Sequence, residues 1–150
     1  MAGVSAGIAA QVALTQQAIA LEVLKQSVEL QQQAAAALID AVASRIVHHL
    51  HPNRIFLFGS QQRGNATKDS DIDLLVILEN RHQLASLSHR QRAGKVLDLF
   101  RYRSFGLDAL VLTEAEIQQL QATNEEEWDL VLEILKTGKP LYERAKATAQ

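Results

Sequence analysis

The residues best suited to chemistry lie in the stretch FLFGSQQRGNATKDSDIDLLVIL, residues 56–78. Its first polar element is the pair Gly59 and Ser60, which follows a short apolar run. A turn of this kind presents free backbone N–H groups and a hydroxyl, and glycine lets the backbone come close to a ligand. The pair is therefore a candidate receptor for phosphate oxygens.

Two carboxylates, Asp71 and Asp73, follow after ten further residues and belong to a second apolar run. In a strand, side chains two residues apart point to the same face, about 6–7 Å from each other. Like charges in that arrangement repel. The pair becomes favourable when a divalent cation lies between them, because Mg²⁺ binds one or two carboxylates together with phosphates and water. The alternative is a pair of solvated aspartates at the end of a strand.

Three short apolar runs are predicted to be the strands that position these residues, and they cover residues 55–58, 72–77 and 107–112. A helix is expected over about 82–101. Thr113 and Glu116 have the spacing of a capping box, and so do Asn124 and Glu127, so each pair predicts the start of a further helix. This alternation predicts an α/β (α+β) domain with a small mixed sheet and helices on one of its faces.

The first 43 residues have a different composition, with 13 alanines and 7 glutamines and no aromatic residue. These are good helix formers, so one long helix is expected over about 8–50, either continuous or broken once. Its apolar residues form two stripes, one through Leu14, Leu21 and Val28 and a second through Ile19 and Leu30. Two stripes favour contact with more than one neighbour. Folding back onto its own domain and self-association as a homo-oligomer are equally compatible with this pattern.

We therefore divide the chain into an N-terminal helical extension (1–42), an α/β domain that carries the candidate site (43–143) and a tail (144–150). The chain has 15 basic and 17 acidic residues and therefore no basic excess. A protein that binds nucleic acid or a membrane surface needs such an excess, so neither partner is expected. The absence of cysteine excludes disulfides and thiolate metal sites. A membrane span and a signal peptide are not expected either, so the sequence predicts a soluble cytoplasmic protein.

The order of Gly59 and Ser60, ten residues, then Asp71-Ile72-Asp73 resembles the minimal nucleotidyltransferases of the polymerase-β-like superfamily. The flanking residues are similar as well, namely Arg63-Gly64 and the run Ser70 to Val76. The resemblance covers about 43–143 and includes the closing segment EILKTGKPLYE. Two departures are Gln61, where many relatives have arginine, and Lys68, where proline is frequent. The missing arginine would weaken triphosphate binding.

This resemblance implies a metal-dependent transfer from ATP. Its third carboxylate falls on Asp108, which lies between apolar residues in the last expected strand. Asp71, Asp73 and Asp108 would then hold two Mg²⁺ ions, and Asp108 would serve as the base for the acceptor hydroxyl. Gly59, Ser60 and Arg63 would bind the phosphates of the nucleotide.

The resemblance also implies an acceptor, and three alternatives stay open. Relatives of this size often act on a tyrosine of a small all-helical partner protein, as the antitoxin of a toxin–antitoxin pair. Transfer to a small hydroxylated molecule, such as an aminoglycoside, is the second alternative. The third is a binding module that keeps the fold without turnover.

The N-terminal segment VSAGIAAQVALTQQAIALEVLKQSVELQQQAAAALIDAV separately resembles the short bacterial proteins of a motility protein family. That resemblance rests on about 40 helical residues and implies little chemistry.

Overall fold

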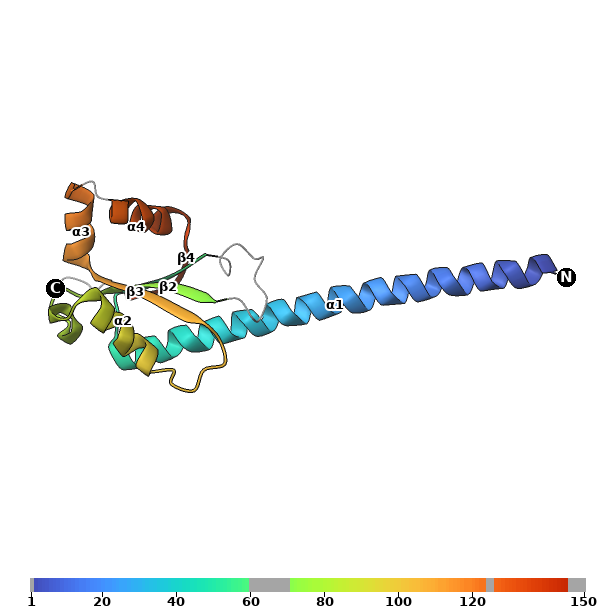
Figure 1. Ribbon diagram of the computed structural model, residues 1–150, viewed down its shortest axis with the longest axis horizontal. Helices are drawn as coiled ribbons and strands as arrows, with labels where there is room; N and C mark the ends of the chain where they lie inside the picture. Colours follow the sequence, from blue (N-terminus) through green and yellow to red (C-terminus); the bar gives the residue numbers. More distant parts are fainter. Residues whose placement is uncertain (1, 60–70, 124–125, 146–150) are drawn as a thin grey trace.

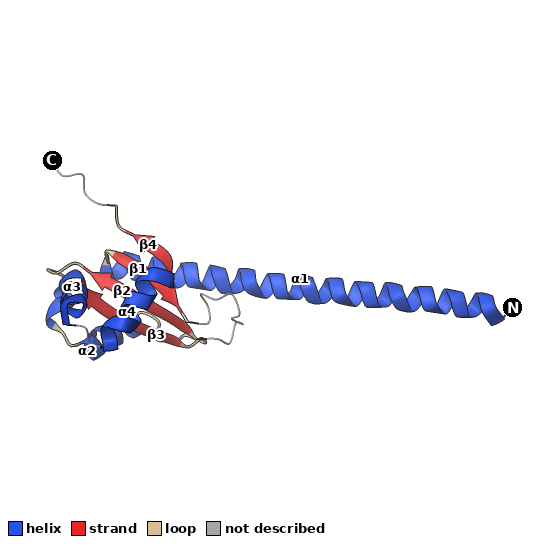
Figure 2. Ribbon diagram, turned by 90° about the horizontal axis from the view of Figure 1, so that it is seen from above, coloured by secondary structure: helices blue, strands red, loops and turns tan. Residues whose placement is uncertain are grey.

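The computed structural model describes residues 2–59, 71–123 and 126–145. Within them a long helix leads into a compact α/β body (Figures 1 and 2). The elements in chain order are α1 (Ala2–Leu50), β1 (Arg54–Phe58), β2 (Ile72–Leu78), the 3₁₀ turn η1 (Gln83–Ser86), α2 (His89–Asp98), β3 (Leu107–Thr113), α3 (Glu114–Thr123), α4 (Glu126–Thr137) and β4 (Lys139–Glu143).

The described strands form one mixed sheet in the order β3-β2-β1-β4. Strand β1 pairs antiparallel with both β2 and β4, whereas β2 and β3 are parallel. The parallel pair needs a crossover, and η1 and α2 supply it. The starts of β2 and β3 and the end of β1 therefore lie at the same edge of the sheet.

One face of the sheet is covered by the C-terminal part of α1 and by α2. From α1, Ile39, Val42 and Ile46 are buried there, and Val96 and Phe100 come from α2 and the turn after it. They pack on alternate residues of the strands, as the two-residue period of a strand requires. The strand residues in this cluster are Ile55, Leu57, Ile72, Leu74, Val76, Leu78, Leu107, Ala109 and Val111.

The opposite face is covered by α3 and α4. The prediction that helices cover only one face of the sheet is therefore wrong. Ile117 of α3 and Val131 and Ile134 of α4 form a second buried cluster with Leu75, Ile77 and Leu112. The physical reason is visible in β2, where five consecutive residues from Leu74 to Leu78 are buried. A strand that is apolar on both sides needs a layer on each. The α/β fold class itself is confirmed.

Two further elements differ from the sequence prediction. The expected helix over 82–101 is interrupted, because Ser88 caps α2 in a reciprocal capping box with Gln91 and so separates it from η1. Strand β4 was not predicted, since Gly138 and Pro140 together indicate only the end of a helix. β4 lies at the edge of the sheet, beside a register shift between Ile55 and Phe56, where proline is tolerated. The capping box of Thr113 and Glu116 is confirmed at the start of α3.

Helix α1 is continuous from Ala2 to Leu50 and ends at His51, which has a positive φ of 48° and precedes Pro52. It passes the expected boundary between residues 42 and 43 without a break, and residues on both sides of that boundary enter the core. From residue 10 to residue 34 every side chain is exposed. This part of α1 does not fold back on its own domain. None of the helices in the described residues has the length and apolar character needed to cross a membrane.

Arg92 of α2 is buried, with 3% of its surface exposed. Its guanidinium donates to the carbonyls of Leu84 (2.9 Å), Ala85 (2.8 Å) and Val111 (3.2 Å) and pairs with Glu116 at 2.5 Å. The network therefore joins η1, α2, β3 and α3.

Burial alone would raise the pKa of Glu116, but hydrogen bonds from His89, Thr113 and Arg92 lower this pKa to about 2. Because the folded-state pKa is depressed, the stabilising contribution of Glu116 is present above about pH 4.5. It is lost as the pH falls toward 2.

We expect Arg92→Met to lower the free energy of unfolding by about 3 kcal/mol, because it removes the charged partner of Glu116 and a donor to each of three carbonyl oxygens. Urea denaturation measures this change. Arg90→Met on the same helix is the matched control, since Arg90 is exposed and its loss should cost less than about 0.5 kcal/mol. Equal effects of the two substitutions would contradict the structural role of Arg92.

Candidate active site

Four of the residues selected from the sequence meet at the sheet edge where β1 ends and β2 and β3 begin. Gly59 follows β1, Asp71 precedes β2, and Asp73 and Asp108 are the second residues of β2 and β3. In the register of the sheet, Asp73 lies opposite Asp108 on one side and opposite Phe58 on the other. Ser60 and Arg63 were also selected, and both lie outside the described residues.

The carboxylates project on the face of the sheet that carries α3 and α4. Ile72 and Leu74 are fully buried on the opposite face, so the residues between and beside them, Asp71 and Asp73, turn toward the α3–α4 side. Asp73 is half-buried, whereas Asp71 and Asp108 are exposed. The second cluster on this face begins at Leu75, so the carboxylates lie at its rim rather than beneath it.

Gly59 is required at its position for two reasons. Its φ is +78°, a backbone conformation that costs about 1–2 kcal/mol for a residue with a side chain. A Cβ atom built there would also collide with the Oδ2 atom of Asp73. The backbone of the turn thus approaches one of the carboxylates as closely as glycine allows.

Gly106 supports the same site from the other side, and the sequence analysis missed it. A Cβ atom at Gly106 would collide with the Oδ1 atom of Asp71. The Gly106 carbonyl accepts a hydrogen bond from the backbone N–H of Ile72 at 2.9 Å. The loop before β3 is therefore fastened to the start of β2. A glycine directly before an apolar strand was the only signal, and it is a weak one.

Asp73 is the carboxylate most affected by its neighbours. Burial raises the pKa of Asp73 above its usual value, and the charges of Asp108 and Asp71 raise this pKa further. Three negative groups therefore share one edge of the sheet with no cation among the described residues to balance them. Such an arrangement is unfavourable for folding and is typical of a site for a cation.

The donors at this edge fit Mg²⁺, which prefers carboxylate oxygens, water and phosphate. As they stand, no three acidic or imidazole side chains of the described residues already surround a common point. The three aspartates would therefore have to draw together around an ion. Asp71 and Asp108 are exposed and free to do so.

A separate hollow of about 790 Å³ opens at the opposite edge of the sheet, lined by Asn53, Arg54, Glu79 and Glu114 among others. Its main charges already pair, since Arg54 and Glu114 lie 2.9 Å apart. It contains none of the residues selected from the sequence. The carboxylate edge therefore remains the better candidate for chemistry.

A model of the family "Polymerase beta, Nucleotidyltransferase" matches residues 41–147, which include every carboxylate of this edge. The chain belongs to this family. The nucleotidyltransferase match begins within α1, and residues 1–40 lie outside it. No curated protein matches the chain.

A solved structure supports the same fold for this nucleotidyltransferase domain. It is the crystal structure, at 1.40 Å resolution, of an inferred nucleotidyltransferase from Sulfolobus solfataricus, with a TM-score of 0.53 and 19% sequence identity. The alignment covers 82% of this chain and 93% of the other. At this identity the likeness concerns the fold alone.

We expect Gly59→Ala to lower the free energy of unfolding by about 1–2 kcal/mol through its positive φ and to displace Asp73. Gly94→Ala is the control. Gly94 lies in α2, and a Cβ atom there would meet nothing within 4 Å. That substitution should stabilise the protein by up to about 1 kcal/mol, because alanine is the better helix former. Thermal unfolding of both variants tests the difference in sign, and a stabilised Gly59→Ala would refute the assignment.

We expect Asp73→Asn to raise the free energy of unfolding at pH 7 in the absence of metal, by no more than about 1 kcal/mol because solvent screens the site. A raised folded-state pKa means that charged Asp73 costs stability above that pKa, and that this cost disappears as the pH falls below the usual value of 3.8. The advantage of the variant should therefore vanish near pH 3. Asp40→Asn, at an exposed position of α1, is the matched control and should change the free energy of unfolding at pH 7 by less than about 0.5 kcal/mol. A destabilised Asp73→Asn would identify Asp73 as a structural residue.

Proposed function

We propose that this domain transfers AMP from ATP to a hydroxyl acceptor in a Mg²⁺-dependent reaction. The observation that carries the proposal is the convergence of Asp71, Asp73 and Asp108 at one strand edge, beside a glycine turn of positive φ. Membership of the nucleotidyltransferase family supports the transfer chemistry. Enzymes of this type work mainly by positioning and by neutralising charge.

Different residues of the site bind the phosphates and the metal. The backbone N–H groups that begin at Gly59, with Ser60 and Arg63, bind the β- and γ-phosphates of ATP. Asp71, Asp73 and Asp108 would hold the metal, the last two from paired positions of β2 and β3. When bound, Mg²⁺ supplies positive charge to the triphosphate and favours ionisation of the acceptor hydroxyl.

The transfer forms one bond to phosphorus and breaks another. The acceptor oxygen attacks the α-phosphorus of ATP and forms a new P–O bond. The bond to the β-phosphate breaks, and pyrophosphate leaves. The hydroxyl proton passes to the Asp108 carboxylate, whose exposed position lets it exchange that proton with solvent.

The acceptor we favour is a tyrosine of a small all-helical partner protein, so that the domain acts as the antitoxin of a pair. Asp71 and Asp108 are exposed, and the described residues beyond α1 form a single body around the sheet. Within those residues there is no second domain that could enclose a small acceptor such as an aminoglycoside. A protein acceptor brings its own surface.

We expect ATP to bind only in the presence of Mg²⁺ or Mn²⁺, because the carboxylates at this edge repel the triphosphate unless a cation lies between them. Calorimetry with and without a chelator measures this. Equal affinity in both conditions would rule out the metal-dependent model.

We expect Asp73→Asn to reduce AMP transfer by at least about 100-fold while the protein remains folded. Transfer is measured with ATP labelled at the α-phosphate and a candidate small all-helical protein as the acceptor. Asp40→Asn is the matched control and should retain full transfer. Label on an aminoglycoside instead of the protein would favour the second acceptor. Unchanged transfer by Asp73→Asn would refute the ligand assignment.

A further inference from the structure

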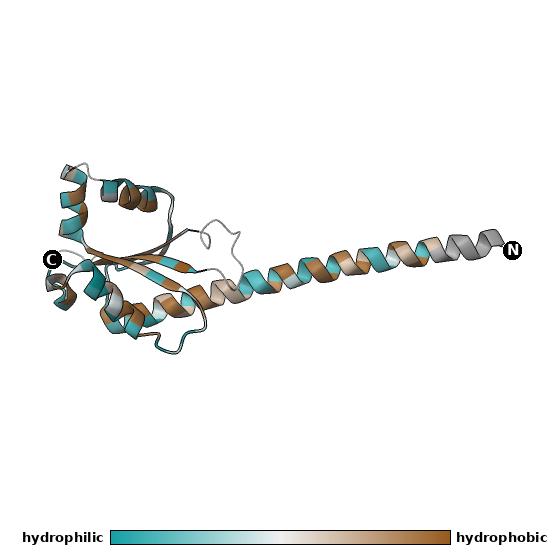
Figure 3. Ribbon diagram, viewed as in Figure 1, coloured by the Kyte–Doolittle hydropathy of each residue, from teal (hydrophilic) through white to brown (hydrophobic). Residues whose placement is uncertain are grey.

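The free part of α1 carries more exposed apolar surface than any other element described. Figure 3 shows hydrophobic residues recurring along the helix well beyond the domain. Eight large apolar side chains between residues 12 and 30 are each about half exposed or more, and they are Val12, Leu14, Ile19, Leu21, Val23, Leu24, Val28 and Leu30. Surface of this kind on an extended helix indicates a contact with another chain.

These side chains lie on two opposite faces of α1. At 100° per residue, Leu14, Leu21 and Val28 fall on the face that continues into buried Ile39 and Ile46. We name this face the docking stripe, defined by Leu14, Leu21, Leu24 and Val28. The other four, Val12, Ile19, Val23 and Leu30, fall within about 40° of one another on the far side of the helix. We name them the outer stripe.

The outer stripe cannot be covered by the domain of its own chain. Ile39, Val42 and Ile46 fix the side of α1 on which that domain lies, and the outer stripe is roughly 180° away from it. Its cover must therefore come from another molecule.

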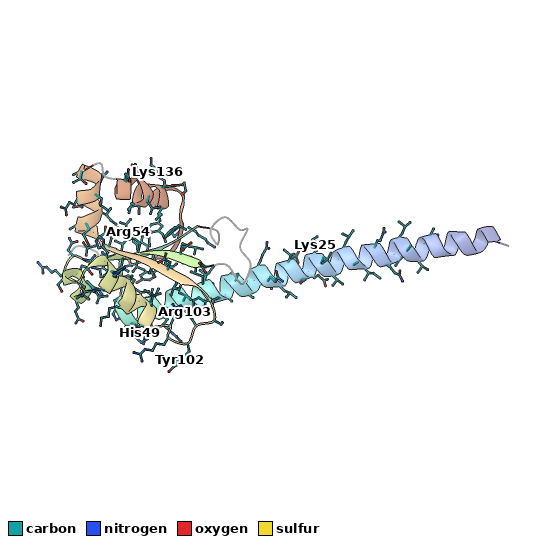
Figure 4. All side chains as sticks on the ribbon, viewed as in Figure 1. Lys25, His49, Arg54, Tyr102, Arg103 and Lys136 are labelled. Atoms are coloured by element: carbon teal, nitrogen blue, oxygen red, sulfur yellow. The ribbon has the colours of Figure 1, made fainter. Side chains whose placement is uncertain are left out.

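The charge of this segment restricts the partner. Between residues 10 and 39 the only charged residues are Glu22, Lys25 and Glu29, and Lys25 extends from the helix into solvent (Figure 4). Such a surface offers no electrostatic attraction for nucleic acid or for a strongly charged protein. A suitable partner is another nearly uncharged amphipathic helix, and a second copy of α1 meets that requirement.

The outer stripe is also complementary to itself when reversed. Val12 and Leu30 are each nine residues from Leu21, and Ile19 and Val23 are each two residues from it. The interruptions of the stripe follow the same symmetry, because Gln16 and Gln26 are each five residues away. In an antiparallel pair centred beside residue 21, apolar side chains would therefore face apolar side chains, and glutamine would face glutamine.

We propose that α1 forms an antiparallel helical pair with α1 of a second copy, through the outer stripe and with its two-fold axis beside residue 21. Val12 then packs against Leu30 of the second copy, and Ile19 against Val23. The spacing of seven, four and seven residues along the stripe is that of a coiled-coil seam. The two domains lie at opposite ends of the pair, so neither obstructs the other, and the nucleotide site is not involved.

The first experiment is light scattering on the full chain. We expect the native protein to have twice the mass of one chain, and the variant Ile19→Gln/Val23→Gln to have the mass of one. The matched control, Leu14→Gln/Leu21→Gln, makes the same change on the docking stripe and should keep the doubled mass. A native monomer, or a pair that is lost only in the control, would overturn the proposal.

The second experiment tests whether the two helices run antiparallel or parallel. It uses engineered disulfides, and the chain contains no native cysteine that could interfere. A mixture of the variants Val12→Cys and Leu30→Cys, annealed and then oxidised, should give a disulfide between the two different chains. Neither variant alone should cross-link. A parallel pair would instead cross-link Val12→Cys to itself, and that result would overturn the antiparallel arrangement.

Discussion

The parallel pairing of β2 with β3 is the constraint on which the rest of this molecule depends. It places Asp73 directly opposite Asp108 and so gathers like charges at one edge of the sheet. The same pairing requires a crossover, and this is why η1 and α2 cover one face. The repulsion between these charges is offset chiefly by the two apolar layers that pack on β2 and by the hydrogen bonds of Arg92.

The two glycines at this edge explain how so tight an arrangement is built. Gly59 and Gly106 bring backbone against the carboxylates of Asp73 and Asp71, respectively, from two different loops. Each removes a side chain where the acidic group needs room. The site is therefore shaped as much by absent Cβ atoms as by the charged residues themselves.

The sequence was sufficient for those parts of the fold that local patterns determine. The apolar runs predicted β1, β2 and β3, and the paired aspartates could be placed on one face because a strand has a period of two. Sequence patterns did not predict the features that depend on tertiary contacts. Arg92 resembles any surface arginine until Glu116 and three carbonyls surround it, and β4 contains a proline that only an edge strand accepts. The contribution of Gly106 depends on a loop contact that no local pattern encodes.

The unbroken course of α1 has a mechanical consequence. About 57 Å of rigid helix separates residue 2 from Asp40, at 1.5 Å per residue, and the last turns of that helix are built into the core. The helix is thus a lever whose short arm is held by Ile39, Val42 and Ile46. A tilt of about 5° at the core moves the far end by about 5 Å. Any load attached near the N-terminus is therefore transmitted directly to the sheet that carries the aspartates.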